Sequence, residues 1–358
     1  MSDLLFSEFK LGRITLKNRV VMSPMTRNRA INNIPNEIMA EYYSLRAGAG
    51  LIITEGTSPS PNGLGYPRIP GAFSQDQTLG WSKVTQAVHG KGGRIFLQLM
   101  HTGRVSHPLN MPQSAKIIAP SPIGLSGEMW TDQKQMQPYP TPVEMTLADI
   151  RDTVNEYAHS CRLAMEAGFD GVELHGANGY LIEQFINPSA NRRKDQYGGS
   201  TENRIRFAVE VARSAAQAIG ADKIGMRVSP YGVFNDMGVY DGIDETYALL
   251  AEELGKAGLV HMHIVDHSSM GAPAVSPEVK AIIRNKFKGA VILSGGYDAD
   301  RAERDLSENK GDLVAFGRPF IANPNLVEKL KKKVELRVPD QTTFYTPGEK
   351  GYTDYPLD

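Results

Sequence analysis

Short apolar runs alternate with longer amphipathic segments along almost the whole chain. The apolar runs are roughly four to eight residues long and bounded by glycine or polar residues, which is typical of buried strands. Eight strands are predicted, at residues 19–24, 50–56, 94–100, 171–174, 223–230, 259–266, 290–296 and 312–317. Eight segments with helical spacing follow them, at residues 36–47, 76–89, 146–167, 201–219, 245–257, 277–287, 299–307 and 325–333. Thr146 with Asp149, and Ser200, are suited to cap two of these helices.

Strict alternation of strands and helices implies parallel strands joined by right-handed crossovers. Eight such units predict a closed (β/α)8 TIM barrel. A doubly wound open sheet is the alternative, but no glycine fingerprint follows the first predicted strand. No shift in composition marks a boundary, so residues 1–358 are expected to form a single domain. That length exceeds the roughly 250 residues of a minimal barrel.

The extra length is expected mainly in the loops after the third and fourth strands. Apolar pieces at residues 4–9 and 14–16 predict a small N-terminal hairpin before the first barrel strand. A long loop after the third strand, residues 101–145, is rich in proline. Loops of that length are uncommon unless they cover or form a binding site. We therefore expect a capping loop with its own small hairpin over the barrel mouth.

The overall charge excludes some classes of partner. Acidic and basic residues number 40 and 39, giving a net charge of -1, which argues against nucleic acid or a membrane surface as partner. No apolar stretch approaches the roughly 20 residues of a spanning helix. Cys161 is the single cysteine, so neither a disulfide framework nor a cysteine metal site is expected. No signal-peptide pattern is present at the start, and a cytoplasmic protein is the expectation.

The most informative polar residues follow the fourth predicted strand. His175, Asn178 and Tyr180 come within six positions directly after residues 171–174. In a barrel the carboxyl ends of the strands converge on one face, and that face carries the active site. These side chains are therefore candidates for hydrogen bonding and proton transfer to a substrate.

Other strand ends contribute neutral and cationic groups to the same face. Thr26 and Gln98 are neutral and suited to the edge of an amide-rich ring. Arg227 would place a cation in the barrel mouth, where an unpaired charge is costly. Such a cation fits a ligand on which negative charge develops, whereas a salt bridge with Glu55 or Glu173 is the alternative.

The last two strand ends have the features of a phosphate site. Gly295 and Gly296 follow the seventh strand, and Gly317 and Arg318 follow the eighth. Barrels commonly bind phosphate at this position. Glycine lets the backbone approach a ligand closely, and arginine adds a charge-assisted hydrogen bond. A tight turn alone is the alternative explanation for the paired glycines.

The histidines do not suggest a metal site. His261 and His263 alternate on the sixth predicted strand and so share a face, but no carboxylate is expected in register with them. We interpret them as core or helix-facing residues, and we expect no metal ion.

Several long blocks together resemble the Old Yellow Enzyme family of flavin-dependent ene-reductases. The blocks are residues 24–26, 98–99, 175–185, 191–204, 316–324 and 351–356, and the likeness covers essentially the whole chain in order. The resemblance implies a barrel that binds FMN, takes electrons from NADPH or NADH, and passes hydride to an electron-poor alkene. The expected substrates are α,β-unsaturated carbonyl compounds, maleimides and nitroalkenes.

The resemblance also implies a role for each strand end. Thr26 would bond the flavin near its C4 carbonyl and N5, Gln98 would hold the pyrimidine edge, and Arg227 would face N1 and the C2 carbonyl. The residues implied to flank the ring are Pro24, Met25 and Gly56. The residues implied to take the phosphate are Gly295, Gly296, Gly317 and Arg318.

On the substrate side, the resemblance implies that His175 and Asn178 bind the substrate oxygen and that Tyr180 donates the proton. Tyr66 and Tyr345 match aromatic positions of the family's substrate pocket. Met100 stands where several members carry tryptophan, so the pocket is expected to be wider.

Two other functions stay open at this point. One is a flavin-free barrel lyase or aldolase acting on a phosphorylated substrate, and the other is a barrel that binds flavin as a sensor without turnover. The protein is expected to be a monomer or a homodimer.

Overall fold

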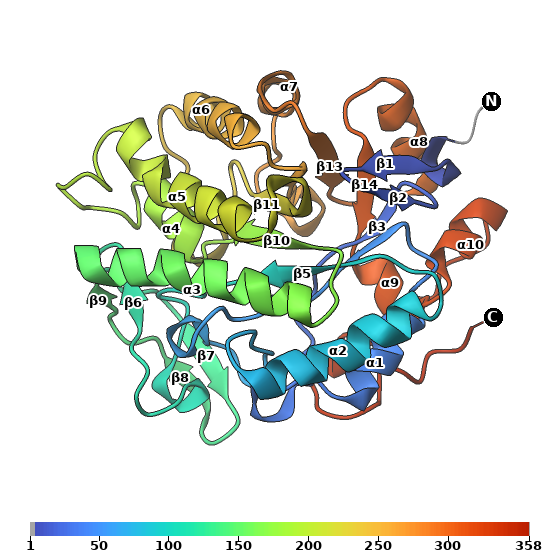
Figure 1. Cartoon of the computed structure of the whole chain (residues 1–358), viewed down its shortest axis with the longest axis horizontal. Helices are drawn as coiled ribbons and strands as arrows, with labels where there is room; N and C mark the ends of the chain where they lie inside the picture. The colour runs from blue at the N-terminus through green and yellow to red at the C-terminus, as the bar shows by residue number, and fades with distance from the viewer. Residues whose placement is uncertain (1–3, 358) are drawn as a thin grey trace.

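A closed barrel of eight parallel strands forms the centre of the computed structural model, which describes residues 4–357 (Figure 1). The strands are β3 (Val20–Met22), β4 (Leu51–Ile53), β5 (Ile95–Leu99), β10 (Gly171–Gly176), β11 (Ile224–Val228), β12 (His261–Ile264), β13 (Ala290–Ser294) and β14 (Leu313–Phe316). Neighbours in the barrel follow chain order, and β14 pairs with β3 to close the ring. The predicted (β/α)8 barrel is confirmed.

Helices surround the barrel and follow its strands in the predicted alternation (Figure 1). The eight predicted helices are α1 (Glu37–Ser44), α2 (Gln75–His89), α3 (Leu147–Glu166), α5 (Thr201–Ile219), α6 (Ile243–Lys256), α7 (Pro277–Lys286), α8 (Ala299–Ser307) and α10 (Leu326–Lys332). The expected caps are present. Thr146 forms a capping box with Asp149, and the Ser200 side chain accepts a hydrogen bond from the Asn203 N–H.

Two further α-helices of residues 4–357 were not predicted. They are α4 (Leu181–Ile186) and α9 (Arg318–Ala322), which begin shortly after strands β10 and β14. Both are too short to show an amphipathic repeat, and α4 is buried along its whole length, so it has no polar face to reveal its period.

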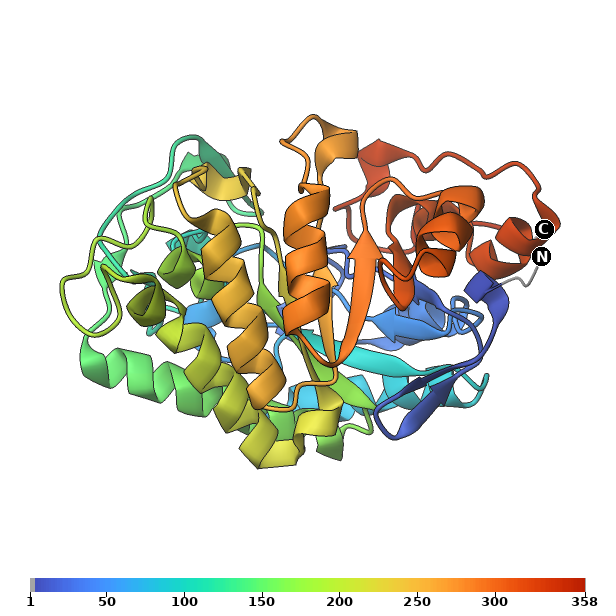
Figure 2. The same cartoon turned by 90° about the horizontal axis from the view of Figure 1, so that it is seen from above.

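The N-terminal hairpin closes one end of the barrel. Strands β1 (Phe9–Leu11) and β2 (Ile14–Leu16) pair antiparallel, as predicted, and lie on the lower side in Figure 2. Their side chains Leu11 and Leu16 are buried in one cluster with inward-facing residues of β3, β4, β5, β13 and β14. The first apolar piece is only partly strand, because η1 (Leu4–Phe6) is a 3-10 helix.

The capping loop contains the hairpin expected from the sequence. Its strands are β6 (Ile118–Ala119), β7 (Glu128–Thr131), β8 (Gln135–Pro138) and β9 (Val143–Glu144). β7 and β8 pair antiparallel, and β6 and β9 form a second two-stranded pair that closes the base of this loop. Residues of β7 and β8 line a cavity at the carboxyl ends of the barrel strands, so the loop does cover the mouth.

The C-terminal segment also reaches the mouth. Arg27 and Arg29, which follow β3, both donate hydrogen bonds to the carbonyl oxygen of Phe344. Arg29 bonds the Thr343 carbonyl oxygen as well. These two buried arginines therefore hold the neighbouring Tyr345 over the cavity.

Candidate active site

Two adjoining cavities, of about 580 and about 540 Å³, lie at the carboxyl ends of the barrel strands. Their walls have Pro24, Thr26, Asn178, Arg227 and Tyr345 in common. The predicted residues found only in the first cavity are Gly56, Tyr66, Gln98, Met100, His175 and Tyr180. Those found only in the second are Met25, Gly295, Gly296, Gly317 and Arg318. Every site residue predicted from the sequence therefore lines one of these two cavities.

His175 and Arg227 form a buried polar pair on neighbouring strands. They lie opposite each other in the register of β10 and β11. Within the described chain, His175 Nδ1 and Arg227 Nε are buried without a hydrogen-bond partner. Burial and the nearby Arg227 cation hold the pKa of His175 well below its usual range. His175 is therefore a neutral imidazole with a polar nitrogen left to satisfy.

The alternative explanation of Arg227 as a salt-bridge partner is wrong for the described residues. Glu55 accepts hydrogen bonds from the Arg27 N–H and the Tyr43 hydroxyl. Glu173 is occupied by three other side chains. Burial lowers the pKa of Arg227 to about 10, which still leaves the guanidinium charged at neutral pH.

Asn178 is held in an unusual backbone conformation by three hydrogen bonds. Its φ is 59°, in the left-handed region that asparagine tolerates. The Asn178 N–H donates to Ser229 Oγ at 2.9 Å, and its carbonyl oxygen accepts from Asn235 Nδ2 at 2.7 Å. Its side-chain Oδ1 lies 2.8 Å from His267 Nε2. These bonds do not involve the side-chain nitrogen Nδ2 of Asn178, a residue that lines both cavities.

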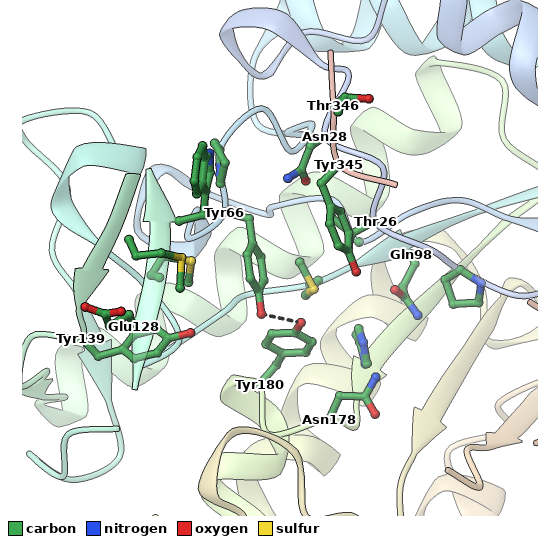
Figure 3. Close-up of a pocket in the computed structure, with 18 of the residues that line it drawn as sticks. Thr26, Asn28, Tyr66, Gln98, Glu128, Tyr139, Asn178, Tyr180, Tyr345 and Thr346 are labelled. Carbon is green, nitrogen blue, oxygen red and sulfur yellow. Dashed lines mark hydrogen bonds between the residues drawn. The ribbon is translucent and has the colours of Figure 1, made fainter. Parts of the chain in front are cut away.

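Tyr180 lies beside His175 and meets Tyr66 across the first cavity. The rings of His175 and Tyr180 are 5.0 Å apart in an edge-to-face arrangement. Figure 3 shows the hydroxyl groups of Tyr66 and Tyr180 pointing toward one another, 3.0 Å apart. Burial raises the pKa of Tyr180 to about 12. Tyr180 is therefore protonated over the ordinary pH range.

Gly56 makes room for Met100 in the wall of the first cavity. A Cβ at Gly56 would lie about 3.1 Å from Met100 Cβ and would collide with the end of the Met100 side chain. Met100 in turn packs with Tyr66 and Tyr180 in a small buried cluster. A side chain at position 56 would therefore displace the flexible end of Met100 and change this wall of the first cavity.

The second cavity has a backbone cradle at the ends of β13 and β14. Gly295 has a φ of 123°, which only glycine adopts readily, and Gly296 has a φ of 62°, in the left-handed region that favours glycine. At Gly317 a Cβ would make only ordinary van der Waals contact, with Met25 Sδ as its nearest neighbour at 3.7 Å, so the surrounding protein does not exclude a side chain there. Arg318 is exposed at the rim of this cavity, and its guanidinium contacts Met270 Sδ. Glycine backbone with a nearby cation fits a phosphate group.

A carboxylate does lie beside the two strand histidines, contrary to expectation. Glu173 Oε2 is 3.0 Å from His261 Nε2 and 2.9 Å from His263 Nδ1, and all three side chains are buried. The prediction that they are core residues is confirmed. No group that could hold a metal ion was found among residues 4–357.

Sequence reasoning missed the residues contributed by the capping loop and by the loop after β12. In the first cavity these are Glu128, Met129, Trp130, Met136 and Tyr139, and in the second they include Asp266, His267, Ser269 and Met270. Trp130 and Tyr139 are aromatic residues in a loop expected to cover the mouth, which was the one available signal.

Within the described chain, no helix is both long and apolar enough for a membrane span.

The fold and the two cavities define a (β/α)8 barrel protein that can hold a phosphorylated ring cofactor. The model of the NADH:flavin oxidoreductase / NADH oxidase family matches residues 4–337. A probable flavin mononucleotide-dependent alkene reductase of Leishmania infantum is 38% identical, covering 99% of this chain and 98% of that protein.

Two solved structures are also similar over nearly their whole length. Morphinone reductase in complex with tetrahydroNAD is 41% identical, with a TM-score of 0.93, covering 98% of this chain and 97% of that one. The Old Yellow Enzyme homologue of Zymomonas mobilis is 38% identical, with a TM-score of 0.94 and 99% of both chains covered. The chain belongs to the NADH:flavin oxidoreductase / NADH oxidase family, the family of the Old Yellow Enzyme homologues, and is an FMN-dependent oxidoreductase with a nicotinamide reductant.

The site fits FMN on its own geometry. Arg227 lines both cavities, and its Nε has no hydrogen-bond partner among the described residues, so its guanidinium can meet the pyrimidine edge of a ring that lies between the cavities. Gly295, Gly296 and Gly317 line the second cavity without side chains, so their backbone can lie close to a phosphate group, and the exposed Arg318 can neutralise its charge.

Proposed function

We propose that this protein reduces electron-poor alkenes, with NADPH or NADH as reductant and FMN bound across the two cavities. FMN, when bound, takes hydride from the nicotinamide and supplies it to the β carbon of the alkene. The substrates would be α,β-unsaturated carbonyl compounds, maleimides or nitroalkenes. The observation that carries the proposal is the group of donors at the carboxyl end of β10, where His175, Asn178 and Tyr180 surround one cavity beside Arg227.

In this proposal His175 and Asn178 bind one substrate oxygen. A neutral imidazole N–H and an amide N–H would both donate to the carbonyl or nitro oxygen. Two donors on that oxygen withdraw electron density from the conjugated double bond and stabilise the negative charge that develops on it. The buried position of His175 strengthens the electrostatic effect of its donor.

Tyr180 would deliver the proton to the α carbon. Its raised pKa, about 12, keeps the phenol protonated until a carbanion-like carbon demands the proton. Tyr66 shares a hydrogen bond with Tyr180 and would stabilise its oxygen as the proton leaves. Hydride and proton would then arrive on opposite faces of the alkene.

On the cofactor side, Thr26 would bond the flavin near N5, and Gln98 the pyrimidine edge. Arg227 would oppose the negative charge that gathers near N1 and the C2 carbonyl on reduction. Pro24, Met25 and Gly56 would flank the ring. The cradle of Gly295, Gly296, Gly317 and Arg318 would hold the phosphate.

Tyr66, Met100 and Tyr345 would shape the substrate side of the first cavity.

The alternative of a Schiff-base lyase or aldolase finds no support, because none of the eight described barrel strands carries a lysine. A single FMN-binding domain over residues 1–358, a monomer or homodimer, and a cytoplasmic location remain our predictions.

Colour provides the direct test of the cofactor. Purified protein incubated with FMN and freed of unbound flavin should be yellow and should bleach with NADPH or NADH without oxygen. If the protein stays colourless, the proposal is refuted, and a flavin-free lyase or aldolase becomes the better explanation.

A further inference from the structure

Glu173 is a buried carboxylate that the proposed reaction does not use. It lies in the middle of β10, two residues before His175, and is fully inaccessible to solvent. Its Oε1 accepts a hydrogen bond from Gln98 Nε2 at 2.8 Å. Its Oε2 lies within hydrogen-bond distance of His261 and His263. Three side chains from two other barrel strands thus converge on one carboxylate beneath the first cavity.

The barrel is built locally to allow this convergence. His261 lies on β12 and is separated from β10 by β11. In the sheet register Gly225 of β11 stands between Glu173 and His261, pairing with both. A Cβ at Gly225 would collide with the His261 imidazole. Glycine at this position therefore lets the histidine ring cross β11 and reach Glu173.

The carboxylate stays ionised in spite of its burial. Burial alone would raise the pKa of Glu173, but the neighbouring His263 and His261 hold it well below the usual range. Each ring then donates the proton of the nitrogen that faces Oε2. Glu173 thereby has donors on both oxygens, as a buried charge requires.

This arrangement fixes the orientation of the Gln98 carboxamide. An ionised carboxylate only accepts hydrogen bonds, so Gln98 must turn its NH2 group toward Glu173. Gln98 is itself buried and lines the first cavity. Its carbonyl oxygen is therefore the atom left free to accept a hydrogen bond from a ligand. The pyrimidine edge of a flavin offers a matching donor, the N3–H.

We propose that Glu173, supported by His261 and His263, is a positioning residue that sets the Gln98 carbonyl oxygen to accept from the N3–H of FMN. This proposal rests on the proposed placement of FMN in the first cavity. It assigns the Glu173 cluster to recognition of the cofactor, in addition to its place in the core. Loss of the carboxylate would free Gln98 to turn its NH2 group toward the ring, where two donors would oppose each other.

An exchange experiment on the holoenzyme tests the proposal. The holoenzyme is equilibrated with equal, excess concentrations of FMN and 3-methyl-FMN, which lacks the N3–H, and the bound flavins are released and quantified. Wild type should hold FMN over 3-methyl-FMN by roughly tenfold or more, because an acceptor is left unpaired by the analogue. In Glu173→Gln this ratio should fall severalfold, while the steric effect of the methyl group is shared by both proteins.

His261 supplies a matched pair of variants that do not touch the cavity. His261→Gln keeps an N–H for Glu173 and should keep most of the wild-type ratio, whereas His261→Leu removes the donor and should lower it. If Glu173→Gln fails to fold, the flavin ratios of these two variants still test the positioning role of Glu173. Thermal unfolding of each variant identifies a loss that is merely structural.

The outcomes separate this proposal from the proposed function. A wild type without preference, or a preference retained in Glu173→Gln and in His261→Leu, overturns the positioning role and leaves flavin binding intact. A ratio lowered equally by His261→Gln and His261→Leu also overturns it, because the N–H that residue 261 donates to Glu173 would then have no effect on flavin preference. Wild type that binds neither flavin refutes the proposed function instead.

Discussion

The hydroxyl oxygens of Tyr66 and Tyr180 lie 3.0 Å apart inside the first cavity, and the two phenols share a hydrogen bond. Burial raises the pKa of Tyr180 to about 12, and the hydrogen bond with Tyr66 opposes that rise. Tyr66 comes from the loop after β4, and Tyr180 lies at the start of α4. Their contact joins two sides of the barrel mouth at the atom that we assign to proton transfer.

Tyr180→Phe should therefore slow alkene reduction by roughly 100-fold, the effect typical of removing a general acid. Tyr66→Phe should have a smaller effect in the same direction, because the Tyr180 oxygen would lose the hydrogen bond from Tyr66 that stabilises it after the proton has left. Rates of reduction by NADPH or NADH should change little in either variant, which makes that half-reaction the internal control. Wild-type turnover in Tyr180→Phe would show that another group supplies the proton.

His175→Ala/Asn178→Ala should keep its flavin but lose substrate affinity and turnover. Loss of one donor to a developing oxyanion typically costs about 100- to 1000-fold in rate. Steady-state kinetics with 2-cyclohexenone and a nitroalkene, together with the flavin content of the purified protein, check this prediction. Asn285→Ala, on the exposed face of α7, is the control. Unchanged turnover in the double variant would remove these residues from substrate binding.

Met100→Trp should narrow the first cavity and change which face of a substituted enone is reduced. Met100 packs against Tyr66 and Tyr180, so a larger ring there would displace substrate from its present orientation. The measurement is product stereochemistry over a set of enones of increasing size. Met100→Leu, which nearly preserves volume, should behave like wild type. The idea fails if Met100→Trp leaves both stereochemistry and substrate range unaltered.

Glu183 should make stability depend on pH. Burial raises its pKa to about 7 from the usual 4.5, while it accepts hydrogen bonds from the Gly179 N–H and the Ser229 hydroxyl. Between those two pH values the folded protein keeps a proton that the unfolded chain has lost. The contribution of Glu183 to the free energy of unfolding is therefore full below about pH 4.5 and is lost as pH rises through about 7.

Urea unfolding of wild type and Glu183→Gln at pH 5 and pH 8 measures this effect. The variant should be relatively more stable at pH 8 than at pH 5, because its amide stays neutral at both. Glu335→Gln, at an exposed position, should show no such difference. A wild-type-to-variant difference independent of pH would mean that Glu183 is charged throughout.

The site residues at the strand ends were predictable because a barrel brings the carboxyl ends of its strands to one face, whatever conformation the loops adopt. Alternation alone located all eight strands, and the residues directly after them line the two cavities. Thr146 and Asp149 likewise act within a single turn, so their capping box could be predicted locally.

The Glu173 cluster could not be predicted in the same way. Glu173 and His261 are 88 positions apart and meet across an intervening strand. Their contact depends on the absence of a side chain at Gly225, which alternation of apolar residues does not reveal. Capping-loop residues such as Trp130 and Tyr139 were missed for a related reason, since the path of a long loop is set by tertiary contacts.

The central claim is that reduced enzyme passes its electrons to an electron-poor alkene. The most direct measurement mixes anaerobically reduced holoenzyme with 2-cyclohexenone in a stopped-flow spectrophotometer and identifies the product. We predict that the flavin absorbance returns at a rate that rises with enone concentration, and that cyclohexanone forms in equal amount. Flavin that stays reduced with cyclohexenone, a maleimide and a nitroalkene alike would contradict the account and leave a barrel that binds flavin without this turnover.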